Sequence, residues 1–121
     1  MTKTVLTVDD SRMMLDMLQI TLAGEGYKVL QAEDGVAALE MLKTERPDVI
    51  ITDINMPRLD GFGFIQQVRQ RDHLRTTPIL VLTTEVSDDK KMRARNAGAT
   101  GWIVKPFNPP SLLDIVRRVA A

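Results

Sequence analysis

The chain has 121 residues, 44% of them hydrophobic and 26% charged, which are the size and composition of one globular domain. Its 16 basic and 16 acidic side chains give a formal net charge of +0, which argues against an electrostatic nucleic-acid binder and a polybasic membrane anchor. It has no cysteine and one histidine, which excludes disulfide scaffolds, thiolate metal sites and cysteine nucleophiles. No apolar run is long enough for a signal peptide or a membrane span, so we expect a cytoplasmic monomer with one domain over residues 1–121.

Short segments rich in Val, Ile, Leu and Thr recur along the chain and predict strands. In chain order they are Thr4–Val8, Lys28–Ala32, Val49–Thr52, Ile79–Leu82 and Trp102–Val104. The third and fourth are continuously apolar, which suits strands covered on both faces, as in a parallel sheet between two layers of helices.

The segments between these strands have apolar residues three and four positions apart, which predicts helices. The clearest stripes are Leu15, Leu18 and Leu22, then Val36, Leu39 and Leu42, then Ile65 and Val68, and finally Leu112, Ile115, Val116 and Val119. The segment 87–97 has the weakest stripe. Helix starts are indicated at Asp34, Asp60, Ser87 and Asn108, and helix ends at Gly24 and Gly98. The alternation predicts an α/β fold, a doubly wound five-stranded parallel sheet with five helices.

Polar side chains follow four of the predicted strands at their carboxyl ends. Asp9 and Asp10 follow the first strand, Asp53 the third, Thr83 the fourth and Lys105 the fifth. In such a sheet, ligands bind at this edge, where the strand order reverses. Clustered carboxylates repel one another, and a divalent cation relieves the repulsion. Oxygen ligands without histidine or cysteine favour Mg²⁺, or Mn²⁺, over zinc.

A lysine and a hydroxyl beside a metal ion suit the oxygens of a phosphoryl group. We therefore infer phosphoryl transfer, with an aspartate as the candidate nucleophile. The chain has neither a P-loop nor a dinucleotide fingerprint, which argues against a nucleotide ligand. It also has no obvious general base at this edge, so a slow phospho-aspartate protein fits better than a fast hydrolase.

Several short motifs along the chain resemble those of response-regulator receiver domains, and most closely those of CheY-type single-domain chemotaxis regulators. They are Val8-Asp9-Asp10-Ser11, Ile51-Thr52-Asp53-Ile54-Asn55-Met56-Pro57, Asp60-Gly61, Leu82-Thr83, Gly98-Ala99 and Lys105-Pro106-Phe107. The resemblance implies a flavodoxin-like sheet with strand order 2-1-3-4-5. It also implies a phosphoacceptor switch protein rather than an enzyme, with slow self-catalysed phosphorylation and dephosphorylation.

The resemblance implies a role for each residue at the predicted site. Asp53 would accept a phosphoryl group from the phosphohistidine of a sensor kinase. Asp9, Asp10, Asp53 and the main-chain carbonyl of Asn55 would hold Mg²⁺. Lys105 would pair with the phosphoryl group or with Asp53.

The resemblance also implies a switch built from Thr83 and Trp102. Thr83 would move to bond the new phosphoryl oxygens, and Trp102 would rotate into the space that it leaves. An alternative is that Trp102 only fills the core, since tyrosine or phenylalanine is commoner at this position of the family.

Other positions are expected to adjust the chemistry rather than carry it out. The resemblance places Asn55, Thr84 and Glu85 where they would tune hydrolysis of the acyl phosphate. Thr84 replaces the usual alanine or glycine and would narrow access to the phosphoryl group. The peptide bond between Lys105 and Pro106 would be cis.

The expected partners are a sensor histidine kinase, in particular a chemotaxis kinase, and a flagellar motor switch protein or another protein target. No nucleic acid or membrane is expected, nor an attached output domain, because the chain ends at Ala121 soon after the last predicted helix. A phosphorelay or phosphate-sink receiver, and a receiver cut from a longer protein, stay open as alternatives.

Two further classes also stay open. A Mg²⁺-dependent phosphohydrolase with an aspartyl-phosphate intermediate usually needs a second acid/base aspartate, but Asn55 stands two residues after Asp53. A flavodoxin-like FMN module needs a phosphate-cradling loop after the first strand, where Asp9 and Asp10 would repel the phosphate.

Overall fold

The computed structural model describes residues 2–121. Over these residues, five strands alternate with five α-helices, and one short 3₁₀ turn, η1 (Asp72–Leu74), follows the third helix. The strands are β1 (Thr4–Val8), β2 (Lys28–Ala32), β3 (Val49–Thr52), β4 (Ile79–Thr83) and β5 (Gly101–Val104). The helices are α1 (Arg12–Ala23), α2 (Gly35–Met41), α3 (Gly61–Arg69), α4 (Asp88–Ala97) and α5 (Pro109–Ala120). Each predicted strand is confirmed to within one residue at either end.

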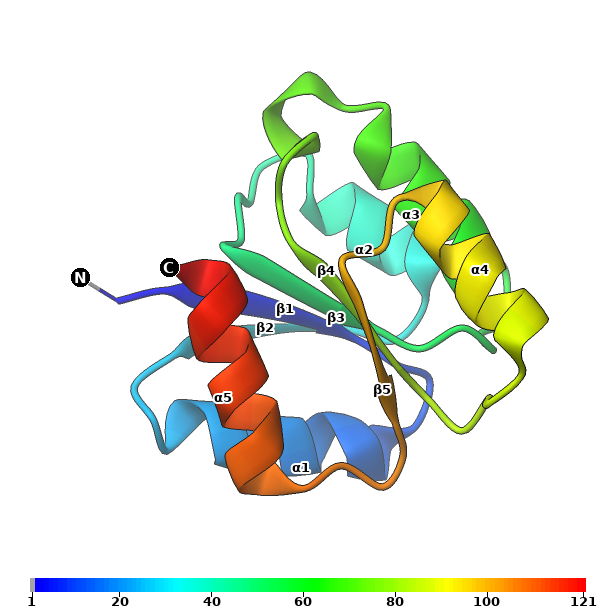
Figure 1. Ribbon diagram of the computed structural model, residues 1–121. Helices are drawn as coiled ribbons and strands as arrows, with labels where there is room; N and C mark the ends of the chain where they lie inside the picture. Colours follow the sequence, from blue (N-terminus) through cyan, green and yellow to red (C-terminus); the bar gives the residue numbers. More distant parts are fainter. Residues whose placement is uncertain (1) are drawn as a thin grey trace.

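The strands form one parallel sheet in the order β2-β1-β3-β4-β5, which confirms the predicted flavodoxin-like fold. Helices α2, α3 and α4 cover one face of the sheet, and α1 and α5 cover the other (Figure 1). From β1 the chain first adds β2 on one side and then β3 on the other, so the strand order reverses between β1 and β3. Ligands of such sheets bind beyond the strand ends at this point.

The core lies in two layers, because successive side chains of a strand point to opposite faces of the sheet. Val5 packs with Leu18 of α1 and Val116 of α5, whereas its neighbour Leu6 packs with Phe64 of α3 on the other face. This explains why the central strands are continuously apolar in sequence.

The helix starts expected from the sequence are confirmed at Asp34, Asp60, Ser87 and Asn108, whose side chains accept hydrogen bonds from main-chain amides of the first turn. Ser11 caps α1 in the same way, by accepting from the amide of Met14 at 3.2 Å. This cap is not among the helix starts expected from the sequence.

The two predicted helix ends differ in conformation. Gly98 follows α4 with φ 118°, the left-handed geometry that glycine adopts most easily. Gly24 follows α1 with a right-handed backbone, and the positive φ of that turn, 90°, belongs to Gly26 instead.

Helix α4 has the weakest apolar face, as its sequence predicts, and buries only Ala94 and Ala97. Polar contacts supplement this packing. The guanidinium of Arg93 lies 4.1 Å from the ring centre of Phe62 in α3. Arg69, also in α3, donates from Nε and Nη2 to the carbonyl of Gly98, just after the end of α4. No helix within residues 2–121 is both long enough and apolar enough to cross a bilayer.

Candidate functional site

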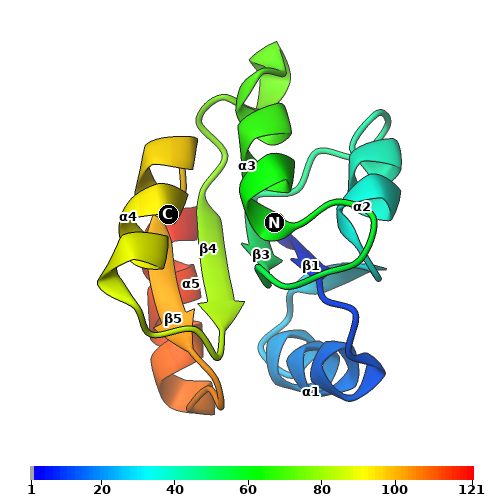
Figure 2. The same cartoon turned by 90° about the vertical axis from the view of Figure 1, so that its right-hand side faces the viewer.

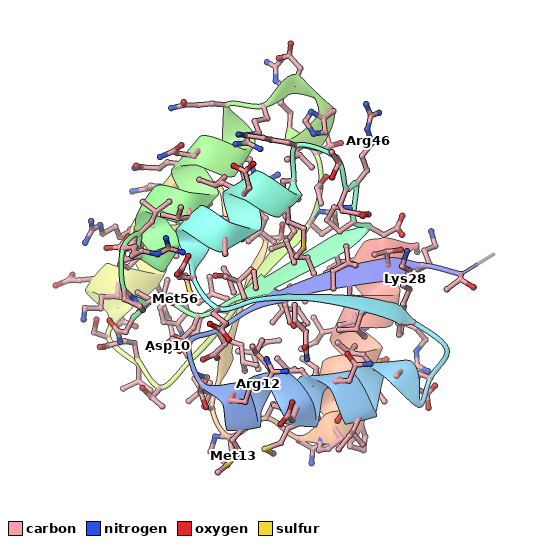
Figure 3. All side chains as sticks on the ribbon, turned by 180° about the vertical axis from the view of Figure 1, so that it is seen from behind. Asp10, Arg12, Met13, Lys28, Arg46 and Met56 are labelled. Atoms are coloured by element: carbon pink, nitrogen blue, oxygen red, sulfur yellow. The ribbon has the colours of Figure 1, made fainter. Side chains whose placement is uncertain are left out.

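Three carboxylates gather at the carboxyl ends of β1 and β3, beside the reversal of strand order. Carboxylate oxygens of Asp9, Asp10 and Asp53 all lie within 4.8 Å of one another, the only such acidic cluster among residues 2–121. Asp9 is 2% exposed and Asp53 8%, whereas Asp10 faces solvent. Figure 2 turns this edge of the sheet toward the viewer, and Figure 3 shows Asp10 at the opposite end of the sheet from Lys28.

Lys105, which follows β5, joins two of these carboxylates. Its Nζ donates to Oδ2 of Asp9 at 2.8 Å and to Oδ2 of Asp53 at 2.7 Å. Burial alone lowers the pKa of Lys105, but its hydrogen bonds to Asp53 and Asp9, and their charges, outweigh burial and raise the pKa. Burial raises the pKa of Asp9, and hydrogen bonds from Lys105 and the Ser11 amide offset only part of that effect. The site therefore holds a charged lysine between buried acids.

The second carboxylate oxygen of each buried aspartate accepts a hydrogen bond from a main-chain amide. Oδ1 of Asp53 accepts from the amide of Ile54 at 2.6 Å, and Oδ1 of Asp9 accepts from the amide of Ser11 at 2.9 Å. These amides belong to the turns that leave β3 and β1. Asn55, two residues beyond Asp53, is exposed on the loop that leads to α3.

The end of β4 and the loop after it bring the predicted hydroxyl and two predicted tuning residues to the same edge. Thr83 is fully buried, and its Oγ1 accepts from the amide of Glu85 at 3.3 Å. Thr84 is exposed. The carboxylate of Glu85 is paired with Lys90 of α4 at 2.9 Å. The hydrogen bond from Lys90 lowers the pKa of Glu85, with a smaller contribution from the side chain of Asn55.

Trp102 of β5 lies partly buried against α4. Its indole Nε1 donates to the main-chain carbonyl of Glu85 at 3.2 Å. The ring also lines a cavity of about 520 Å³ together with Met92 and Arg95 of α4. The indole is thus hydrogen-bonded to the loop that follows Thr83.

The connection between β5 and α5 sets the position of Lys105. The peptide bond between Lys105 and Pro106 is cis, and the side chain of Phe107 is buried against the face covered by α1 and α5. The amide of Lys105 donates to the carbonyl of Thr83 at 2.8 Å, so β4 and β5 stay paired up to the site.

Two supporting features of the site were not recognised from the sequence. A Cβ atom at Gly61 would collide with the main-chain oxygen of Asp53, so the first residue of α3 must be glycine for the helix to start this close to the site. In the sequence, Asp60-Gly61 indicated a helix start and matched a family motif, but did not reveal this steric role. Arg58 pairs with Asp34 at 2.7 Å, a contact between segments that no local sequence pattern connects.

Comparisons with known proteins agree with this geometry. A family model described as response regulator receiver domain matches residues 5–117. The response regulator MprA of Mycobacterium leprae is 42% identical over 114 residues, which cover 93% of this chain and 49% of that protein. The chain therefore spans about half the length of the curated relatives that it matches.

Solved structures are similar over almost their full length. The chemotaxis protein CheY4 of Vibrio cholerae superimposes with a TM-score of 0.94 at 48% identity, covering 98% of this chain and 99% of that one. The receiver domain of the sensor histidine kinase PA1611 of Pseudomonas aeruginosa, with a magnesium ion coordinated in its active site cleft, gives a TM-score of 0.92 at 27% identity. That match covers 99% of this chain and 98% of the other.

Proposed function

The chain belongs to the response regulator receiver domain family, and we propose that it accepts a phosphoryl group on Asp53 with the help of Mg²⁺ and thereby switches a protein-binding face. Receiver domains are phosphoacceptor switch domains rather than classical enzymes, and they take their phosphoryl group from histidine kinases. The observation that carries the proposal is the ammonium of Lys105 bridging Asp9 and Asp53 beside an exposed Asp10.

The donor set fits Mg²⁺, since the clustered carboxylate oxygens are hard ligands and no cysteine or histidine lies among them. In the proposed site, Asp10 and Asp53 would hold the ion, Asp9 would contribute through its carboxylate, and the main-chain carbonyl of Asn55 would complete the protein ligands. The magnesium ion coordinated in the active site cleft of the similar receiver domain of PA1611 supports Mg²⁺ as the ion. When bound, the ion neutralises charge on the phosphoryl oxygens. Mn²⁺ has the same ligand preference and is the alternative.

The surroundings of Asp53 suit a nucleophile that attacks phosphorus. A carboxylate oxygen of Asp53 forms the new bond to phosphorus, while the bond between phosphorus and the imidazole nitrogen of the donor breaks. Lys105 stays beside the reacting carboxylate and stabilises the negative charge that develops on the phosphoryl oxygens. The Ile54 amide holds Oδ1 of Asp53, so that the carboxylate is oriented before the donor arrives.

A chain of hydrogen bonds supports the proposed switch. The hydroxyl of Thr83 accepts from the amide of Glu85, and the carbonyl of Glu85 accepts from the indole of Trp102. A phosphoryl group on Asp53 adds roughly −1.5 to −2 charge and three acceptor oxygens. If these draw the hydroxyl of Thr83 inward, the amide of Glu85 loses its acceptor, and the main chain of Glu85, whose carbonyl holds the indole of Trp102, is free to shift. Asn55, Thr84 and Glu85 tune how long the phosphoryl group persists.

A role in chemotaxis is the finer proposal, with a chemotaxis kinase as donor and a flagellar motor switch protein as target. It rests on the similarity to CheY4 over nearly the whole of both chains. The curated relatives instead include the transcriptional regulatory protein PhoP of Bacillus subtilis, of which the chain covers 45%. A receiver of a longer regulator, a phosphorelay protein and a phosphate sink are the alternatives. The single domain over residues 1–121, the monomeric state and the cytoplasmic location stay predictions.

The test is the intact mass of the protein after incubation with Mg²⁺ and acetyl phosphate, for the wild type and for Asp53→Asn. We expect one added phosphoryl group in the wild type alone, and none after chelation of the metal. A folded wild type that gains no phosphoryl group and releases no inorganic phosphate would overturn the proposal. Sustained turnover of a small phosphate ester would favour the phosphohydrolase alternative.

A further inference from the structure

The loop from β3 to α3 contains a tight turn at Arg58. The amide of Leu59 donates to the carbonyl of Pro57 at 2.8 Å, which closes a three-residue turn around Arg58. Arg58 has φ 67° and is the only residue other than glycine with a positive φ within residues 2–121. A turn of this kind with positive φ at its centre is rare and strained for a residue that carries a side chain.

The side chain of Arg58 forms a bidentate ion pair with one carboxylate. Its Nε donates to Oδ2 of Asp34 at 2.8 Å, and its Nη2 donates to Oδ1 at 2.9 Å. Asp34 is 7% exposed, and its Oδ1 also accepts from the amide of Ala37 in the first turn of α2. The carboxylate therefore caps a helix and anchors the strained turn at the same time. Forked pairs of this kind are more directional than single contacts.

Close packing of main chains surrounds this pair. A Cβ atom at Gly35 would lie 2.9 Å from the carbonyl oxygen of Leu59, so the start of α2 touches the turn directly. An exposed ion pair alone contributes little to stability. The bidentate pair of Arg58 and Asp34 has a further effect. It holds a strained backbone in place, because without the pair the turn is free to relax to another conformation.

The pair connects the two sides of the proposed metal site. On one side, Arg58 lies three residues after Asn55, whose main-chain carbonyl is a proposed ligand. On the other side, Asp34 lies two residues after Ala32, the last residue of β2, whose carbonyl accepts from the amide of Asp9 at 3.1 Å. The pair between Arg58 and Asp34 therefore connects the loop that carries Asn55 with the end of β2, which is itself hydrogen-bonded to Asp9. In Figure 3, Met56 of this loop and Asp10 lie toward the same end of the sheet.

We propose that Arg58 is a positioning residue of the metal site. By gripping Asp34, it holds the β3–α3 loop in its strained turn, and so holds the carbonyl of Asn55 toward the carboxylates of Asp10 and Asp53. The inference rests on the proposed function and adds to it a residue that touches neither the metal nor the phosphoryl group.

The variants that test this remove one partner at a time. Arg58→Gln removes the charge, and Asp34→Asn removes the acceptor charge while keeping an oxygen that caps α2. Arg58→Gly removes the grip and also relieves the backbone strain, because glycine adopts positive φ readily. Arg58→Lys keeps the charge without the fork. The matched control, Arg118→Gln, breaks an arginine–aspartate pair of 2.8 Å on α5.

The readouts are the Mg²⁺ dissociation constant, from calorimetric titration without any phosphodonor, and the melting temperature in EDTA. Arg58→Gln and Asp34→Asn should each weaken Mg²⁺ binding roughly tenfold, the lower end of what residues that orient metal ligands contribute. Combining them should add little, and Arg58→Lys should recover part of the loss. Arg58→Gly should bind as weakly as Arg58→Gln yet melt no lower than the wild type, which a purely structural role does not predict. Arg118→Gln should bind Mg²⁺ as the wild type does.

The outcomes separate this inference from the proposed function. A wild type that binds Mg²⁺, with Arg58→Gln and Arg58→Gly binding it equally well, would overturn the positioning role and leave the metal site standing. A wild type that binds no Mg²⁺ would overturn the proposed metal site itself. If Asp34→Asn fails to fold, the Mg²⁺ dissociation constants of Arg58→Gly and the wild type still test the positioning role.

Discussion

The ammonium of Lys105 lies 2.7 Å from Asp53 and 2.8 Å from Asp9, although these aspartates are 52 and 96 residues away in sequence. The side chain of Lys105 is 12% exposed, so its charge is shielded little by solvent. This one contact links the last strand of the sheet to the first and the third, and it balances two buried carboxylates.

Replacing Lys105 by methionine should destabilise the metal-free protein, because it leaves the charges of Asp9 and Asp53 buried without a partner. We expect a loss of about 3 kcal/mol in the free energy of unfolding, measured by urea denaturation in EDTA. Mg²⁺ should restore part of the loss. Lys43→Met, which removes the exposed pair with Glu40, should cost well under half as much. Equal losses in the two variants would contradict this account.

Mg²⁺ should stabilise the wild type, since a ligand that binds only the folded state shifts the unfolding equilibrium. At a free Mg²⁺ concentration one hundred times the dissociation constant, we expect the free energy of unfolding to rise by about 2.7 kcal/mol. Asp10→Asn should remove most of this gain without lowering stability in EDTA, because Asp10 is exposed. Asp72→Asn, with a side chain that is 97% exposed on the 3₁₀ turn, is the control and should respond to Mg²⁺ as the wild type does. Melting curves with and without Mg²⁺ measure both effects.

The switch proposal predicts that Thr83→Ala still gains a phosphoryl group but no longer signals to Trp102. Trp102 is the only tryptophan of the chain, so its fluorescence reports this one position. The emission should change on phosphorylation in the wild type and in Thr83→Ser, which keeps the hydroxyl, and stay constant in Thr83→Ala. Intact mass confirms the phosphoryl group in each sample. An unchanged response in Thr83→Ala would show that the hydroxyl does not couple the two residues.

Gly61→Ala should be strongly destabilising, because the added methyl group meets main-chain atoms of Asp53 and Ile54 that have no room to move. We expect a loss of about 2–3 kcal/mol in urea denaturation, as for other overpacked sites. Gly63→Ala in the same helix is the matched control. There the methyl group meets the flexible end of Leu59, and the higher helix propensity of alanine offsets the crowding. Similar losses at both positions would contradict the steric argument.

The pairing of Asp34 should appear in the pH dependence of stability. The hydrogen bond from the Ala37 amide, followed by those from Arg58, lowers the pKa of Asp34 below its ordinary value of 3.8. A lowered pKa in the folded state adds stability above pH 3.8, and this stability is lost as the pH falls through the folded-state pKa. The advantage of the wild type over Asp34→Asn should therefore be constant near pH 7 and shrink below pH 4. A stability advantage of the wild type over Asp34→Asn that grows below pH 4 would contradict a lowered pKa of Asp34.

The strands and most of the site could be predicted from the sequence for physical reasons. Strands buried on both faces need unbroken apolar residues, as in β3 and β4, and parallel strands deliver their following residues to one edge. Asp9, Asp53 and Lys105 were therefore expected together before any contact was known, and the structure brings them within hydrogen-bond distance.

Contacts between distant loops could not be predicted in this way. The pairing of Arg58 with Asp34 depends on a backbone turn at Arg58 that no periodicity indicates, and the bond from Trp102 to the Glu85 carbonyl depends on where two loops meet. Asp34 was recognised as a helix cap, which its sequence position does indicate, but not as an anchor for another segment.

The path between Thr83 and Trp102 runs through the peptide groups of Glu85, while the carboxylate of Glu85 points elsewhere and pairs with Lys90. In the proposed switch, one residue thus serves two tasks with separate atoms. Its backbone transmits the signal, and its side chain is free to set how long the signal lasts. Substitution of the Glu85 side chain can therefore change the lifetime of the phosphoryl group without changing the coupling between Thr83 and Trp102.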